Sequence, residues 1–199
     1  NASDLGKSRM SRMNLFKSKS QNLLHYVTSV TFRRIPLFRL DKACELFIDA
    51  MEETRRREPF KLLAYVIMPD HVHLLLNPQA LDIRLTMNRL KGRSARLILD
   101  WLAADGHSDI LGQLVVKDSR SARQTHAVWQ KGFSSIDIVS EKFVIQKMGY
   151  IHANPVRADL CDHPAKWKWS SYAAFLPHAE GSVPIEPDTR GFWNYDEQI

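Results

Sequence analysis

Short apolar runs alternate with amphipathic stretches along this chain. Aromatic and β-branched residues dominate positions 25–33, and a nearly continuous apolar run extends from Phe60 to Met68, so both segments are predicted strands. A tight turn at residues 68–70 leads into a third predicted strand, His71 to Leu76, which pairs with the second as a hairpin. Residues 127–139, rich in aromatic and β-branched positions, predict a fourth strand.

Three longer segments have the spacing of amphipathic helices. Apolar residues recur every three or four positions from Leu40 to Met51, and a charged run to Glu58 follows them. The segment 81–102 predicts a second helix, and Ser140-Glu141 begins a third that Pro155 is expected to end. The order strand, helix, strand, strand, helix, strand, helix predicts an α+β, ferredoxin-like βαββαβ fold. Its four-stranded antiparallel sheet carries helices on one face, and the last helix follows at the C-terminal side.

The chain of 199 residues suits one domain with appendages. Residues 1–24 are expected to form a flexible basic arm, and residues 25–176 the domain itself. Within the domain, residues 106–125 are polar and are interpreted as an insertion or loop. Residues 177–199 are expected to be a loosely ordered tail.

Composition and charge favour an anionic partner. The net charge is +6 and the sequence pI is about 9.4, which is typical of proteins that bind nucleic acid, although a basic surface without that role is the alternative. No apolar run approaches the roughly 20 residues of a membrane-spanning helix. The two cysteines, Cys44 and Cys161, fit no zinc-binding spacing and are expected to be reduced thiols in a cytoplasmic protein.

Two histidines flank one apolar residue in the third predicted strand. His71 and His73 are separated by two positions, so their imidazoles point to the same face of the sheet. Imidazole is the commonest side-chain metal ligand, and burying two polar rings in an otherwise apolar strand needs a reason. The pair therefore predicts a metal site. The alternative is two histidines with purely structural hydrogen bonds.

A second candidate feature lies on the last predicted helix. Tyr150 and Asn154 are four residues apart and share a face with Phe143 and Lys147. A phenol near a metal can act as a nucleophile, and an amide oxygen can be a neutral metal ligand. On spacing alone, the favoured interpretation is that Tyr150 is an ordinary helix residue and Asn154 a C-terminal cap.

Both motifs resemble those of one enzyme family. His71-Val72-His73 after Met68-Pro69-Asp70 resembles the His-hydrophobic-His (HUH) motif of single-tyrosine transposases. The run from Tyr150 to Ala158 (YIHANPVRA) resembles the tyrosine motif of the REP-associated tyrosine transposases (RAYTs) and related insertion-sequence transposases. Residues 128–133 and 167–172 also resemble segments of that family, and the resemblance extends from about His25 to Phe175. Asp159-Leu160 departs from the Gly-Leu that is frequent there.

This resemblance implies a metal-dependent endonuclease and strand transferase that acts on single-stranded DNA through a 5′-phosphotyrosine on Tyr150. It implies Mg²⁺ or Mn²⁺ held by His71, His73 and Asn154, a hairpin or palindromic DNA partner, and a monomer in preference to a homodimer. Rival functions are a non-catalytic ferredoxin-like nucleic-acid binder and a metal-dependent hydrolase that activates water. The basic side chains expected to contact DNA are Arg84, Arg89, Lys91, Arg93, Arg96 and Lys147.

Overall fold

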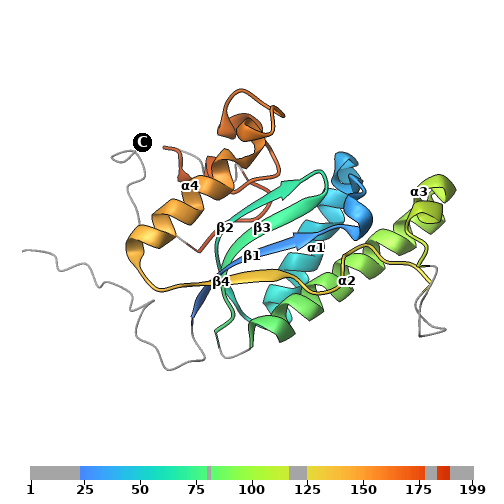
Figure 1. The fold of residues 1–199 in the computed structure, drawn as a ribbon, viewed down its shortest axis with the longest axis horizontal. Coiled ribbons are helices and arrows are strands. Elements are labelled where there is room, and N and C mark those ends of the chain that lie inside the picture. Colours follow the sequence, from blue (N-terminus) through green and yellow to red (C-terminus); the bar gives the residue numbers. More distant parts are fainter. Residues whose placement is uncertain (1–22, 80–81, 117–124, 178–182, 189–199) are drawn as a thin grey trace, which may run out of the picture.

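A four-stranded antiparallel sheet is the centre of the computed structural model, which describes residues 23–79, 82–116, 125–177 and 183–188 (Figure 1). The strands are β1 (Leu24–Val30), β2 (Lys61–Met68), β3 (His71–Asn77) and β4 (Ser134–Ile138), in the order β2-β3-β1-β4. The two central strands, β1 and β3, come from different βα units. This arrangement confirms the predicted ferredoxin-like α+β fold.

Two long helices cover one face of this sheet. They are α1 (Asp41–Arg57) and α2 (Ile83–Ala104), which pack against each other and against the sheet (Figure 1). Alternate β3 residues, namely Val72, Leu74 and Leu76, are fully buried in this core. The residues between them therefore point to the opposite face, which places both histidines away from α1 and α2.

The opposite face is partly covered by α4 (Glu141–Arg157), which packs on β2 and β3. Three apolar residues of α4, Val144, Met148 and Ile151, are buried against the sheet with Val66 and Leu75 among their neighbours in a second core cluster. Helix α4 lies across the sheet from α1 and α2 in Figure 1. This apolar stripe fixes which face of α4 points away from the sheet.

Pro155 does not end this helix, as the sequence pattern predicted, because the helix continues to Arg157. Pro155 lacks the N–H that would donate to the Ile151 carbonyl, and this loss falls in the last turn of the helix. The following N–H groups are still satisfied, since Ala158 donates to the Asn154 carbonyl and Leu160 to the Pro155 carbonyl.

Two other predicted boundaries are also wrong. Strand β4 begins at Ser134 rather than at position 127. Gly132 takes a positive φ of 75°, and Trp129 forms only an isolated bridge to Thr31, the residue after β1. The predicted loop 106–125 contains a short helix, α3 (Ser108–Gln113). The rest of that segment from 117 to 124, with its three basic residues, lies outside the described residues.

Four short 3-10 helices complete the described chain: η1 (Phe32–Arg34), η2 (Leu37–Arg39), η3 (Pro164–Lys166) and η4 (Tyr172–Phe175). None of the helices described is long and apolar enough to cross a membrane. Both cysteines are free thiols, as expected. Of the predicted N-terminal arm, residues 1–22 lie outside the described part.

One part of the predicted loose tail, residues 183–188, packs against the domain instead. Ile185 is only 5% exposed, and its N–H donates to the Tyr65 hydroxyl. Asp188 accepts a hydrogen bond from the Leu62 N–H (2.7 Å) and forms an ion pair with Arg55 (2.5 Å). These contacts tie the segment to β2 and α1.

We therefore expect Asp188→Ala to destabilise the domain by about 1–3 kcal/mol, because it leaves the Leu62 N–H without its acceptor and Arg55 without its carboxylate partner. Urea unfolding measures the change. The matched control is Asp162→Ala, which breaks an exposed pair with Lys166 and should cost about 1 kcal/mol at most. Equal losses in the two variants would contradict a structural role for residues 183–188.

Candidate active site

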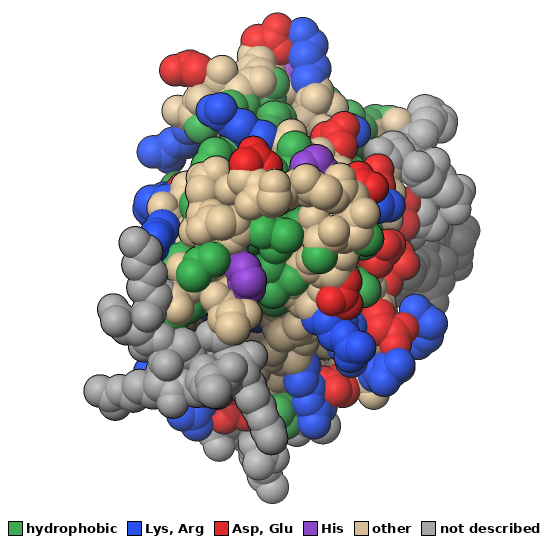
Figure 2. All heavy atoms as spheres, turned by 90° about the vertical axis from the view of Figure 1, so that its right-hand side faces the viewer, with side chains coloured by type: hydrophobic (Ala, Val, Ile, Leu, Met, Phe, Trp, Pro, Cys, Tyr) green, Lys and Arg blue, Asp and Glu red, His purple; other side chains and the backbone are tan. Residues whose placement is uncertain are grey.

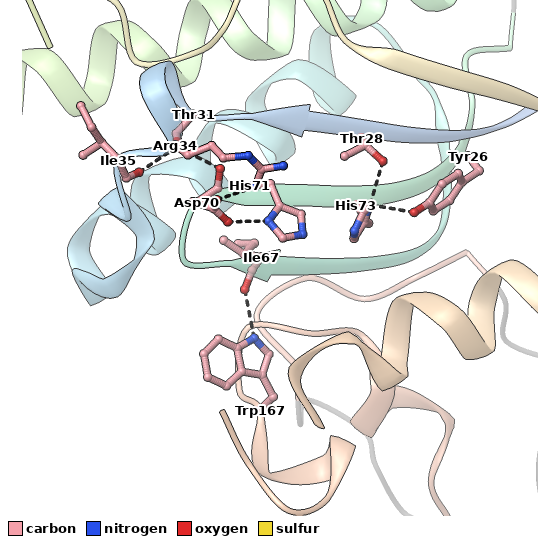
Figure 3. A network of polar contacts seen from close by, with 10 residues as sticks. All are labelled: Tyr26, Thr28, Thr31, Arg34, Ile35, Ile67, Asp70, His71, His73 and Trp167. Atoms are coloured by element: carbon pink, nitrogen blue, oxygen red, sulfur yellow. Dashed lines mark hydrogen bonds and ion pairs between the residues drawn. The ribbon is translucent and has the colours of Figure 1, made fainter. Parts of the chain in front are cut away.

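His71 and His73 lie side by side on the face of β3 that α4 partly covers. Their ring centroids are 4.8 Å apart and the rings are nearly perpendicular, at 79°. His73 sits in the middle of the sheet, opposite Thr28 of β1 and Val66 of β2. His71 is the first residue of the strand after the Met68-Pro69-Asp70 turn (Figure 3). The backbone of β3 thus places both imidazoles on one face of the sheet, as predicted.

The neighbouring turn residue Asp70 orients the His71 ring. His71 Nδ1 lies 2.6 Å from Asp70 Oδ1, and Asp70 also forms an ion pair of 2.7 Å with Arg34 (Figure 3). Partial burial acts to raise the pKa of Asp70, but the hydrogen bonds from His71 and Arg34 outweigh it and lower that pKa below its usual range. The carboxylate accepts the Nδ1–H, which leaves Nε2 as the free nitrogen of His71.

Two hydroxyl groups of β1 orient the His73 ring in the same way. Its Nδ1 lies 2.8 Å from the Tyr26 hydroxyl and 2.8 Å from Thr28 Oγ1. The residue is 5% exposed, and burial, with smaller effects of His71 and Lys147, lowers its pKa to about 3. When the neutral imidazole donates its Nδ1–H to these hydroxyl oxygens, Nε2 is the nitrogen that can bind a metal.

The sequence pattern did not single out Tyr26, Thr28 or Asp70. A signal for the first two was present, because both residues alternate onto the same face of β1 as His73 does on β3. The sequence does not give the register between β1 and β3, which is needed to place Tyr26 and Thr28 beside His73. Burial of Tyr26 raises the pKa of its phenol to about 12, so it acts as a neutral hydrogen-bonding group.

Tyr150 of α4 meets the histidines from the other side. Its ring centroid is 5.6 Å from that of His73 and 6.1 Å from that of Tyr26, with edge-on geometry in both cases. Tyr150 remains 38% exposed, so its ring can be reached from solvent. Lys147 accompanies it, with Nζ 4.7 Å from the centroid of the Tyr26 ring. The tyrosine, the lysine and the His pair therefore share one site.

Asn154 lies one turn beyond Tyr150 on α4. Its Nδ2 donates to the Tyr150 carbonyl oxygen at 2.7 Å, which leaves its Oδ1 as the atom able to serve as a ligand. Its role as a third ligand stays a prediction. His152, on another face of the helix, is fully buried and bonded through Nε2 to Ser171 Oγ (2.9 Å), and burial lowers its pKa to about 3. It is a structural residue.

The basic residues of α2 do not line this site, because α2 lies across the sheet from it. Three of them hold the fold together: Arg89 pairs with Glu58 (2.6 Å), Lys91 donates to the Gln130 carbonyl (2.9 Å) and Arg93 donates to Thr54 (2.5 Å).

Arg84 and Arg96 are largely exposed, and each has only a surface carboxylate as partner. Basic and acidic side chains are interspersed on the face shown in Figure 2, so no single basic patch dominates it. Contact of the α2 side chains with DNA stays a prediction.

The donor atoms fit a weakly held divalent cation. Within the described ranges, no three His, Cys, Asp or Glu side chains form a complete metal cage. Two imidazoles with oriented Nε2 atoms are nevertheless present, and Figure 3 shows the free nitrogen of His71 turned toward His73. Further ligands would have to be oxygens, from an amide, from water or from a bound phosphate.

Comparison with known proteins finds similarity to transposases. Residues 18–107 match the family described as transposase IS200 like. The chain is similar to the IS200-like transposases over that part of its length. A Haemophilus influenzae protein assigned as a REP-associated tyrosine transposase is 25% identical over 172 residues, which span 84% of this chain and 87% of that protein. Such a span includes both His71 and Tyr150, whereas the family match ends before Tyr150.

A solved relative has the same fold. It is a REP-associated tyrosine transposase bound to a REP hairpin, with a TM-score of 0.57, 20% sequence identity, and coverage of 82% of this chain and 83% of that structure. This solved structure confirms the fold, and the two sequence matches confirm the resemblance to the IS200-like and REP-associated tyrosine transposases.

The buried histidines predict a pH dependence of stability. Burial lowers the pKa of His73 and of His152 to about 3 in the folded protein, so the unfolded state binds more protons as the pH falls through the ordinary histidine pKa of 6.5. Stability should therefore fall as pH drops below 6.5, with a slope that approaches about 1.4 kcal/mol per pH unit for each histidine. Urea unfolding between pH 6.5 and 5, in chelator, measures this slope. His152→Gln should halve it, and a flat profile in the wild type would refute the burial argument.

Proposed function

We propose that this protein is an IS200-like transposase, a metal-dependent endonuclease and strand transferase for single-stranded DNA with Tyr150 as its nucleophile. The observation that carries the proposal is the convergence of three side chains from distant segments. The ring centroid of Tyr150 on α4 lies 5.6 Å from that of His73 on β3. The ring centroid of His73 lies 4.8 Å from that of His71 on the same strand, β3. A phenol beside two oriented imidazoles fits phosphoryl transfer through a covalent tyrosine.

The residues that would hold the metal are His71 and His73 through Nε2, with Asn154 Oδ1 as a third candidate ligand. Mg²⁺ or Mn²⁺ there would neutralise the negative oxygens of a phosphodiester. Asp70, Tyr26 and Thr28 fix the two rings in advance, so little reorganisation is needed when substrate arrives.

Tyr150 forms the new bond in this scheme. Its hydroxyl oxygen attacks phosphorus, the bond from phosphorus to the 3′ oxygen breaks, and the protein carries a 5′-phosphotyrosine. The phenol proton leaves to solvent and the 3′ oxygen gains one, so the strand ends in a free 3′-hydroxyl. The phosphotyrosine keeps the energy of the original ester, and attack by a 3′-hydroxyl can therefore reverse the step and join strands.

The proposed substrate is a single strand that folds into a hairpin. The solved relative with this fold was captured with a REP hairpin. The net charge of +6 suits a polyanion. Lys147 at the site, and the exposed Arg84 and Arg96 on α2, are the proposed phosphate contacts, and we propose a monomer as the working unit.

The nucleophile is tested by Tyr150→Phe, which removes one oxygen and keeps the ring packed on His73. We expect DNA binding to be unchanged and the covalent adduct with a hairpin-bearing strand to be lost completely. Mass spectrometry of wild-type digests should find nucleotide mass on the peptide containing Tyr150. Tyr172→Phe is the matched control and should form the adduct.

Other outcomes of the same experiment separate the rivals. Free cleaved product without an adduct would indicate a hydrolase that activates water. A mobility shift with neither product nor adduct would indicate a binding protein. An adduct on any residue other than Tyr150 would overturn the assignment.

The metal is tested by His71→Ala and His73→Ala. Each should lower the rate of adduct formation by about 10³-fold, as expected when several kcal/mol of charge stabilisation is lost. Chelator should abolish wild-type activity, and Mg²⁺ or Mn²⁺ should restore it. His163→Ala, an exposed histidine on the C-terminal segment, is the control. Full activity in chelator would rule out the metal, and unfolding of both variants would favour a structural role for the pair.

A further inference from the structure

Two cations flank the Tyr150 ring on α4. Lys147 Nζ lies 5.8 Å and Arg157 Cζ lies 5.4 Å from the centroid of that ring. Lys147 precedes the tyrosine by one turn and Arg157 follows it by two, so all three side chains share one helix face. The sequence pattern pointed to Lys147 and left Arg157 out.

Neither cation is neutralised by a carboxylate within the part of the chain that the structure describes. Arg34, Arg55 and Arg89, by contrast, pair with Asp70, Asp188 and Glu58. Arg157 and Lys147 instead lie against aromatic rings, which offer only a weak attraction to a cation. Two positive charges without a carboxylate partner, on either side of one exposed phenol, therefore suit the binding of an anion.

We propose that Arg157 binds a non-bridging oxygen of the phosphodiester that Tyr150 attacks, with Lys147 approaching the same phosphate from the other side of the ring. This inference rests on the proposed function and adds a substrate-binding residue to it. The planar guanidinium suits two phosphate oxygens at once, which a lysine cannot match.

Arg157 has a simpler possible role that the test must separate. It is the last residue of α4, where a cation stabilises the helix dipole whether or not DNA is present. A structural role of that kind would affect binding of every DNA strand equally. A direct contact with one phosphate would not.

The experiment compares Tyr150→Phe with Tyr150→Phe/Arg157→Ala, so that binding is measured without cleavage. The probe is a hairpin-forming single strand with a neutral methylphosphonate placed at each backbone position in turn. On the unmodified strand, Arg157→Ala should weaken binding and lower the slope of log affinity against log salt by about 0.7. Arg157→Lys should recover part of the affinity. Arg39→Ala, at an exposed arginine without a described carboxylate partner, is the control and should change neither.

At one backbone position, the methylphosphonate should weaken DNA binding by Tyr150→Phe. The same substitution should have no effect on DNA binding by Tyr150→Phe/Arg157→Ala. That position should be the phosphate that forms the adduct in wild-type protein. The inference would be overturned if Arg157→Ala lowered the affinity equally for all strands or did not lower it at all. It would also be overturned if the effect of Arg157→Ala depended on a phosphate other than the one that forms the adduct. If the coupling appears at one phosphate but wild-type protein forms no adduct anywhere, the proposed nucleophile fails while the contact of Arg157 with DNA stands.

Discussion

Alternation along β3 is the constraint on which the candidate site depends. Val72, Leu74 and Leu76 are completely buried against α1 and α2, so a shift of one residue would bring the histidines into that apolar core. The cost of burying two unsatisfied imidazoles there fixes the register of β3. The same core that stabilises the domain therefore directs His71 and His73 to the opposite face.

Helix α4 completes the site because one of its faces packs on the sheet and another carries Tyr150 and Lys147. Its apolar stripe packs on the sheet, and this packing turns Tyr150 and Lys147 toward the rings of His73 and Tyr26. The Nδ1 contacts of His71 with Asp70, and of His73 with Tyr26 and Thr28, then fix the two rings. Strands and a packed helix carry His71, His73 and Tyr150, with Asp70 in the turn directly before β3, which favours a preorganised site.

The sequence predicted the order of elements from local periodicity, and the candidate site from the spacing of the histidines together with the resemblance to a known family. The i and i+2 spacing of the histidines, together with the family-like motif around Tyr150, was enough to suggest a shared site. The partners Tyr26 and Thr28 depend on the register between β1 and β3, which no local pattern encodes. The late start of β4 depends on the positive φ of Gly132, and the packing of residues 183–188 depends on long-range contacts of Asp188. The basic side chains of α2 were predicted to contact DNA from their charge alone. Charge does not distinguish an arginine in a structural ion pair, such as Arg89, from one that is free to bind DNA.

The central claim is that the two histidines and Tyr150 form one preorganised metal and phosphate site, and a crystal structure of the protein with Mn²⁺ tests it most directly. Anomalous scattering would locate the ion. The account predicts a single Mn²⁺ bound to Nε2 of His71 and of His73, beside the Tyr150 hydroxyl, with the Asp70 and Tyr26 hydrogen bonds to the Nδ1 atoms kept. Mn²⁺ bound through an Nδ1 atom with Asp70 displaced, or bound only away from Tyr150, would contradict it.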